Sequence, residues 1–116
     1  FLAAVLGLEQ ARQFRSAIDG SGTALKLWPK NVSALTGIGN CYYALGELKK
    51  AESAFEETIR LNPKAGSAYN NLAVIFFEQG RKEEALKAAK KAVSLGGPLG
   101  FEYQKTLEEI QGADIP

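Results

Sequence analysis

The sequence predicts an all-α chain, built as an α-solenoid of stacked antiparallel helix pairs. Two observations predict this fold class. Apolar residues recur at helical rather than alternating spacing throughout the chain. In addition, the segment YYALGELKKAESAFEETI (42–59) aligns without a gap with FFEQGRKEEALKAAKKAV (76–93), which lies 34 residues later. A fixed period of this kind is typical of repeat proteins, in which each helix pair buries its apolar face against its neighbours.

Glycine and proline mark the ends of the predicted helices. Gly46 and Gly80 fall at equivalent positions between helical segments, and a glycine inside a helix costs about 1 kcal/mol relative to alanine. We therefore interpret both as turns. Pro29, Pro63 and the run 96–98 (Gly-Gly-Pro) are stop signals after helices. The expected helices span residues 1–10, 13–28, 32–45, 48–61, 66–79, 82–95 and 99–111.

The N-terminal part of the chain departs from this regular pattern. Gly20-Ser21-Gly22 falls within the expected helix 13–28, where helix formers are normal. We expect either a kink at this point or an outer helix face that a missing domain completes. The chain opens on the apolar run FLAAVLGL with no capping residue before it, which is typical of a piece cut from a longer protein.

The period and its marked positions resemble the tetratricopeptide repeat, whose pattern is W-x2-L-G-x2-Y, then A-x3-F, then P. In residues 32–65 the matching positions are Leu35, Ile38, Gly39, Tyr42, Ala51, Phe55 and Pro63. In residues 66–99 they are Tyr69, Leu72, Ala73, Phe76, Ala85 and Ala92, with Ala89 in place of the usual aromatic. The resemblance implies one right-handed domain over residues 1–116. Its parts would be a truncated repeat (1–31), two full repeats (32–65 and 66–99) and a C-terminal capping helix (100–111).

The resemblance also implies which side chains form the core. Gly39 and Ala73 would lie where the two helices of a pair approach closely, so that a larger side chain would push them apart. We expect the aromatic residues at the marked positions to be largely buried, namely Tyr42, Phe55, Tyr69 and Phe76. In the capping helix, Tyr103, Leu107 and Ile110 would point inward.

Composition argues against several classes of function. Lys and Arg number 14 against 13 Asp and Glu, which gives a net charge of +1 and no basic footprint for nucleic acid. The chain has no histidine, and Cys41 is its single cysteine. A metal site, a cofactor site and an activated nucleophile are therefore not expected, and Cys41 is interpreted as a buried core thiol. The apolar run at the N-terminus is too short for direct membrane insertion.

The resemblance implies a binding surface instead. In the family, the first helix of each pair lines a concave groove that holds an extended peptide or a partner's helix, so the expected partner is a protein or peptide. The groove residues carried over by position are Thr36, Gly37, Asn40, Tyr43, Asn70, Asn71, Val74 and Phe77, with Leu2, Leu6, Phe101 and Lys105 at the ends. A subset of the family grips a peptide's C-terminal carboxylate with two asparagines and several basic residues. Asn40, Asn71 and Lys105 match that set, whereas Thr36 and Phe101 stand where lysines are expected.

Two classes of function remain open from the sequence. The first is an interaction module that binds an extended segment in its groove. The second is an accessory segment packed on a catalytic domain, because FLAAVLGLEQARQF and AVSLGGPLGFEYQKTLEEI resemble the C-terminal repeat extension of some bacterial cysteine-peptidase-like envelope proteins. None of that family's catalytic residues map onto this chain. The sequence leaves the partner, the compartment (cytoplasm or bacterial cell envelope) and the oligomeric state open.

Overall fold

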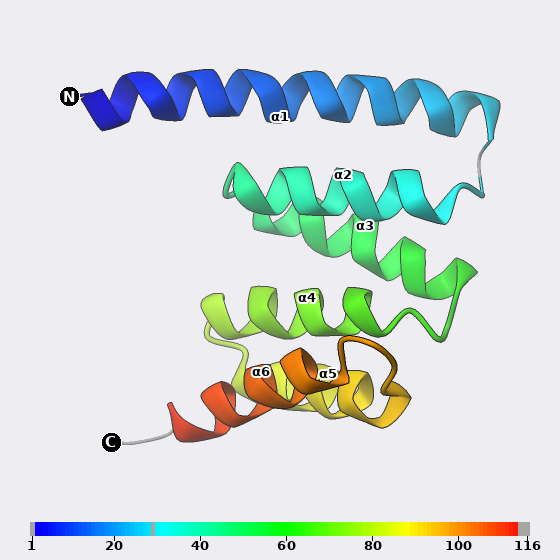
Figure 1. Cartoon of the computed structure of the whole chain (residues 1–116), viewed down its shortest axis with the longest axis vertical. Helices are drawn as coiled ribbons and strands as arrows, with labels where there is room; N and C mark the ends of the chain where they lie inside the picture. The colour runs from blue at the N-terminus through cyan, green and yellow to red at the C-terminus, as the bar shows by residue number, and fades with distance from the viewer. Residues whose placement is uncertain (1, 29, 114–116) are drawn as a thin grey trace. The chain divides into compact units, whose positions relative to one another are not determined.

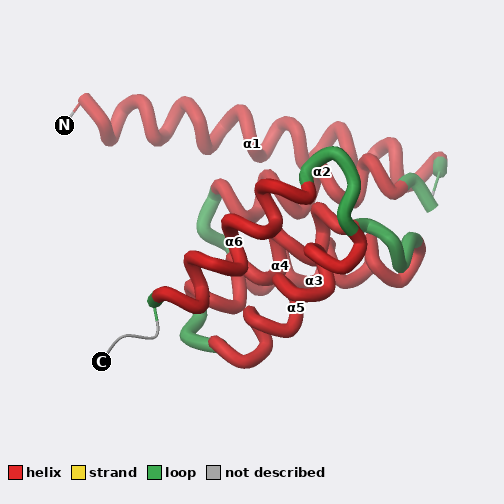
Figure 2. The backbone as a smooth tube through the Cα atoms, turned by 60° about the horizontal axis from the view of Figure 1, so that its bottom comes forward, coloured by secondary structure: helices red, strands yellow, loops and turns green. Residues whose placement is uncertain are grey.

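The computed structural model describes residues 2–28 and 30–113, and the side chains of residues 9–28 and 30–113. Figures 1 and 2 show helices joined by short loops, with no strand in these residues. The prediction of an all-α fold is confirmed. The helices are α1 (Leu2–Leu27), α2 (Val32–Ala44), α3 (Leu48–Leu61), α4 (Gly66–Glu78), α5 (Lys82–Leu95) and α6 (Gly100–Gly112).

The N-terminal helix differs from the prediction. Residues 1–10 and 13–28 were expected to form two helices, but α1 is a single helix of 26 residues that also runs through Gly20 and Gly22 (Figure 1). The prediction of seven helices is therefore wrong by one. The reason lies at Arg12, which is 34 residues before Gly46. Arginine is a strong helix former and, unlike glycine, disfavours the left-handed conformation of a tight turn, so the helix continues.

Gly46 and Gly80 do form equivalent turns, as predicted. Their φ angles are 78° and 77°, in the left-handed region that favours glycine. At the first turn the amide of Glu47 donates to the carbonyl of Tyr42 at 2.9 Å, and at the second the amide of Arg81 donates to the carbonyl of Phe76 at 2.8 Å. These bonds satisfy carbonyl groups at the helix C-terminus in the manner of a Schellman motif. Each turn thereby reverses the chain after the first helix of a pair.

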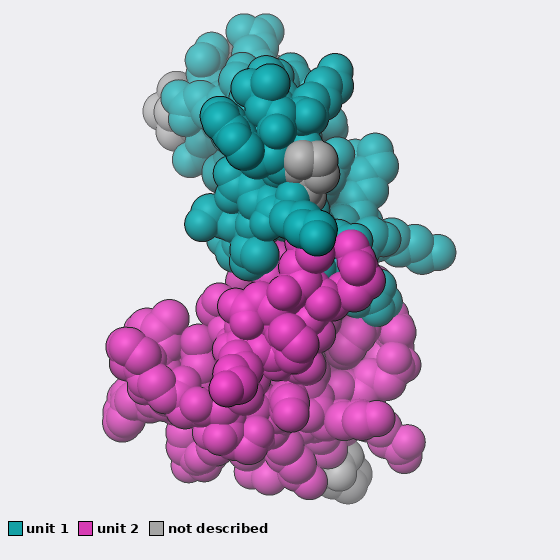
Figure 3. Space-filling view, turned by 90° about the vertical axis from the view of Figure 1, so that its right-hand side faces the viewer, with its two compact units in different colours: residues 1–57 teal, residues 58–116 magenta. Residues whose placement is uncertain are grey.

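The chain divides into two compact units, residues 1–57 and 58–116 (Figure 3). In the first unit α1 packs along α2. Asn31 caps the N-terminus of α2, because its side chain accepts a hydrogen bond from the amide of Ala34 at 3.0 Å. Phe55 of α3 is fully buried against α2. A Cβ atom added at Gly39 would lie 2.8 Å from its ring, which confirms that the helices meet too closely there for a larger residue.

In the second unit, α5 packs against α4, and α6 packs against α5 and touches α4. Small residues let these helices approach, and those with no exposed surface are Ala68, Ala73, Ala85, Ala89 and Ala92. Tyr103, Leu107 and Ile110 of α6 are buried, as predicted for the capping helix. The repeat boundaries themselves stay a prediction.

The expected burial of the four aromatic residues is right for two of them. Phe55 and Phe76 are buried, whereas Tyr42 and Tyr69 are half-buried. A lysine nitrogen lies over each tyrosine ring, since Lys50 Nζ is 5.5 Å from the Tyr42 centroid and Lys91 Nζ is 6.0 Å from that of Tyr69. A tyrosine keeps its hydroxyl in contact with water while its ring packs, so full burial would have cost a hydrogen bond.

Candidate functional site

The face of α2 carries the first group of predicted groove residues. Thr36, Asn40 and Tyr43 are spaced by four and three residues and therefore share one side of the helix. Asn40 is exposed, and Thr36 and Tyr43 are half-buried. The Thr36 hydroxyl donates to the carbonyl of Val32 at 2.9 Å, which leaves its oxygen able to accept. This face therefore offers an exposed amide beside an aromatic ring.

The face of α4 carries the second group. Asn70, Val74 and Phe77 follow the same spacing, with Asn71 beside them. Phe77 is 37% exposed, which is unusual for a phenylalanine, and the other three are half-buried. The side-chain oxygen of Asn70 is buried and has no hydrogen-bond partner among the described residues. A buried acceptor without a donor is costly, so this oxygen is an unusual feature of the packing around α4.

The ends of the predicted groove are described only in part. Phe101 and Lys105 lie one turn apart on α6, where Phe101 is 85% exposed and Lys105 is also exposed. The side chains of Leu2 and Leu6 lie outside the described residues. The structure thus brings the predicted residues together within each helix face, and the groove as a whole remains a prediction.

The described residues do not assemble a metal site. No group of three or more potential metal ligands occurs among them. Cys41 is a free thiol and is half-buried, so its interpretation as a buried core residue is wrong. It follows Asn40, which belongs to the exposed face of α2. In the part of the chain that was searched, no helix has both the length and the apolar character needed to span a membrane.

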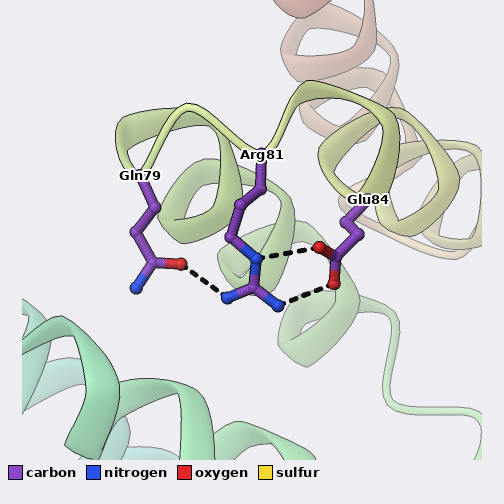
Figure 4. Close-up of polar contacts among 3 residues, drawn as sticks. All are labelled: Gln79, Arg81 and Glu84. Atoms are coloured by element: carbon purple, nitrogen blue, oxygen red, sulfur yellow. Dashed lines mark hydrogen bonds and ion pairs between the residues drawn. The ribbon is translucent and has the colours of Figure 1, made fainter.

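A polar cluster at the α4–α5 turn was missed by the sequence analysis (Figure 4). Arg81 donates from Nε and Nη2 to the two carboxylate oxygens of Glu84, at 2.9 and 2.6 Å, and from Nη1 to Gln79 Oε1 at 2.8 Å. Its guanidinium carbon also lies 4.3 Å from the centroid of the Phe76 ring. Each guanidinium nitrogen already has a partner, so the cluster serves to fix the turn.

The equivalent turn in the first unit holds an ion pair at the same two positions with its charges exchanged. Thirty-four residues before Arg81 and Glu84 stand Glu47 and Lys50, whose side chains pair at 3.8 Å. The cation again lies over the aromatic ring, because Lys50 covers Tyr42 as Arg81 covers Phe76. Both turns thus keep a cation on the ring and an anion beside it. Comparing charges at the 34-residue offset would have revealed this pair from the sequence.

The stabilisation by the Arg81–Glu84 pair is expected to depend on pH. The pKa of Glu84 lies below its ordinary 4.5, first because of the hydrogen bonds from Arg81 and then because of the charges of Arg81 and Lys87. A lowered folded-state pKa means that this stabilisation is present above pH 4.5 and is lost as the pH falls through the folded value. In an Arg81→Met variant, the Glu84 pKa measured by NMR should rise towards 4.5. A Lys87→Met control should raise it less, and an equal rise would contradict the assignment.

A shallow depression at the C-terminal end of α1 is the remaining surface feature of note. It is lined by Leu27, Trp28, Lys30 and Asn31. Leu27 is 66% and Trp28 is 62% exposed, so two large apolar side chains face the solvent side by side. The lining offers one cation and one amide, and that amide oxygen already caps α2. This set has no pair of groups for acid–base or nucleophilic chemistry.

The sequence is similar to a known protein family and to several characterised proteins. The family model for the tetratricopeptide repeat matches residues 2–57 and 42–98. Response regulator aspartate phosphatase E of Bacillus subtilis is 35% identical over 66 residues, covering 53% of this chain and 18% of that protein. Photosystem I assembly protein Ycf3 of Rippkaea orientalis is 36% identical over 90 residues, covering 69% of this chain and 52% of that protein. The chain therefore spans less than two thirds of the length of either relative.

A solved structure matches nearly the whole chain. It is the first TPR of Spaghetti (RPAP3) bound to HSP90 peptide SRMEEVD, with a TM-score of 0.80 and 26% sequence identity. The match covers 96% of this chain and 91% of that chain. A likeness over this extent agrees with the helix order described above.

Proposed function

This chain belongs to the tetratricopeptide repeat family, and from that premise we propose that it is an interaction module that binds an extended peptide or partner segment. The observation that carries the proposal is the similar structure that spans 96% of this chain and holds a peptide. The exposed amide and aromatic groups on the first helices of successive pairs support it. They are the groups expected of a surface that binds a peptide.

Each predicted residue has a role in this proposal. An asparagine amide offers both a donor and an acceptor, which match the free C=O and N–H groups of an extended peptide. Asn40 and Asn71 would hold the peptide backbone in this way, with Asn70 next to Asn71 on α4. Apolar contact would come from Tyr43, Val74 and Phe77, a hydroxyl acceptor from Thr36, and a positive charge from Lys105.

The charges of the site favour recognition of the backbone over capture of a carboxylate. The peptide in the similar structure, SRMEEVD, contains three acidic residues and one basic residue. In this chain Lys105 is the only cation among the proposed groove residues, because Thr36 and Phe101 occupy positions where lysines were expected. One exposed cation gives little attraction for an anion in water. We therefore propose that the partner is bound through hydrogen bonds to its main chain.

The proposal is tested by replacing Asn40 and Asn71 with alanine. The probes are SRMEEVD and a displayed library of random peptides, with affinities measured by isothermal titration calorimetry. Each substitution should weaken binding by about 1–3 kcal/mol, because a peptide group loses its hydrogen-bond partner on burial. The melting temperature should change little, since Asn40 is exposed and Asn71 is half-buried. Gln111→Ala, an exposed amide on α6, is the matched control.

Two outcomes of this experiment carry different meanings. If the double variant binds the selected peptides as tightly as the parent, the proposed faces of α2 and α4 are not the binding site. If SRMEEVD binds and loses its affinity when its C-terminus is amidated, carboxylate capture replaces recognition of the main chain.

The second class of function was an accessory segment on a cysteine-peptidase-like catalytic domain. The relatives reported above do not support it. A peptidase assay on the complete reading frame, with and without residues 1–116, would test it directly. An activity that requires these residues but survives the double asparagine variant would favour that class.

A further inference from the structure

The start of α6 exposes two large apolar side chains. Leu99, the N-cap residue of α6, is 42% exposed, and Phe101 is 85% exposed. We call these two residues the α6 patch. At 3.6 residues per turn, Phe101 lies on the side of α6 opposite Tyr103 and Ile110, which are buried. The Phe101 ring therefore takes no part in the packing of α6 on the rest of the second unit.

The repeat period shows that the fold does not need an aromatic residue at this position. Ser33 and Ser67 stand 68 and 34 residues before Phe101, in α2 and α4. Ser33 is exposed and Ser67 is half-buried, although α2 and α4 are each followed by the second helix of a pair. The position thus stays at the surface in a pair that has both helices, and serine is accepted there. An exposed aromatic side chain without a structural role is a candidate anchor for a partner.

The charges around the α6 patch indicate which partner fits it. The charged residues of α6 are all exposed, and they are Glu102, Lys105, Glu108 and Glu109. Together α4 and α6 carry four glutamates and one lysine, a net charge of −3, whereas α5 carries four lysines and two glutamates, a net charge of +2. Complementary charge favours one partner and suppresses others. The surface of α4 and α6 therefore favours a segment with basic side chains over an acidic one.

Glu108 is the acidic residue best placed to act together with the α6 patch. It follows Phe101 by seven residues, two helical turns, and so lies on the same side of α6. Gln104 Nε2 donates to Glu108 Oε2 at 3.3 Å, which leaves Oε1 able to accept a hydrogen bond from a ligand. A lysine or arginine of the partner can supply that donor as a charge-assisted hydrogen bond.

We propose that the segment bound by this chain is apolar and basic, an inference that rests on the proposed function. A large apolar side chain of the segment packs on the α6 patch, and a lysine or arginine of the segment pairs with Glu108. The apolar contact supplies most of the affinity at this end of the segment. The exposed ion pair contributes selectivity more than affinity.

Selection of phage-displayed random peptides on the 116-residue chain tests this proposal. Peptides selected on the wild type should be enriched in large apolar residues and in Lys and Arg, and depleted in Asp and Glu. Phe101→Ser, which introduces the residue found at positions 33 and 67, should abolish the apolar enrichment and keep the basic one. Glu108→Lys should reverse the charge preference and keep the apolar enrichment. Both positions are exposed, so the circular dichroism spectrum should not change.

Two matched control variants should leave the selected peptides unchanged. Trp28→Ser removes an exposed aromatic side chain from the first unit, and Glu83→Lys reverses an exposed glutamate on α5. A peptide selected on the wild type should bind Phe101→Ser about tenfold more weakly in isothermal titration calorimetry, the effect of losing one aromatic anchor. It should bind the Trp28→Ser variant as tightly as the wild type.

The outcomes distinguish this inference from the proposed function. If the wild type selects peptides that are rich in Asp and Glu, or if Phe101→Ser selects the same peptides as the wild type, this inference is overturned. The proposed function then still holds, provided that the selected peptides lose affinity for the Asn71→Ala variant. If the wild type enriches no peptide at all, both the inference and the proposed function are overturned.

Discussion

Replacing Phe55 with alanine is expected to lower the free energy of unfolding by about 3–5 kcal/mol, the range for a buried aromatic truncated to a methyl group. Phe55 is fully buried and its ring fills the space against Gly39 of α2. On the side of Gly39 the contact is a glycine, which has no side chain that could move into the cavity. Urea denaturation followed by circular dichroism measures the change.

The close approach of Gly39 and Phe55 makes a sharper prediction for a double variant. In the wild-type background Gly39→Ala should destabilise by about 1–3 kcal/mol, since its new methyl group would lie 2.8 Å from the ring. In the Phe55→Ala background the clash is gone, and alanine should stabilise α2 by up to about 1 kcal/mol through its helix propensity. Gly37→Ala is the matched control, because its methyl group would meet Ser21 Oγ at an ordinary 3.9 Å. If Gly39→Ala still destabilises the protein in the Phe55→Ala background, the ring does not set the distance between the helices.

The sequence period predicted the fold so well because the turns depend on local chemistry. Gly46 and Gly80 adopt a positive φ, which favours glycine, so the glycine itself marks each turn in the sequence. The bounds of α3 and α5 agree with the prediction, and those of the other described helices after α1 differ by one residue. The same logic explains the error in α1. Arg12 occupies the turn position, and the prediction placed a break there without the residue that a break requires.

Burial was predicted less well, because it depends on neighbours that the period does not specify. Tyr42 and Tyr69 occupy positions equivalent to core aromatics, yet each keeps part of its surface exposed beneath a lysine. The Arg81–Glu84 pair was missed for a related reason, since its counterpart Glu47–Lys50 carries the opposite charges. A comparison that looks for identical residues in the two repeats misses an ion pair whose acidic and basic residues have changed places.

The sequence predicts which residues of the candidate site share a helix face. It predicts their burial and hydrogen bonding only in part. The helical spacing that groups Thr36 with Asn40, and Asn70 with Val74, is a property of the sequence. The buried and unpaired oxygen of Asn70 is a property of the packing around α4, and no pattern in the sequence indicates it. Side-chain exposure likewise distinguishes Phe77 from Phe76, which are adjacent letters with opposite environments.

Replacing Tyr103 with alanine should produce an effect of similar size in the second unit, about 3–5 kcal/mol. Tyr103 is 6% exposed, and it attaches α6 to the start of α4, where a Cβ atom added at Gly66 would lie 2.9 Å from its ring. The loss should therefore include detachment of α6, seen as increased amide hydrogen exchange over residues 100–112. Phe101→Ala, an exposed aromatic two residues away, is the matched control and should change stability by less than about 0.5 kcal/mol.

The hydroxyl group of Tyr103 adds a dependence on alkaline pH that separates its two roles. Burial, and to a lesser degree the charge of Glu102, raises the pKa of Tyr103 above its ordinary 10.0. A raised folded-state pKa means that the stabilisation is fully present below pH 10.0 and is lost as the pH rises through the folded value. Tyr103→Phe keeps the ring and removes the ionisation, so its stability should fall less steeply than that of the wild type above pH 10. If the stabilities of the wild type and Tyr103→Phe fall in parallel above pH 10, another group controls alkaline unfolding. If Tyr103→Phe is as unstable as Tyr103→Ala, the hydroxyl and not the ring holds α6 in place.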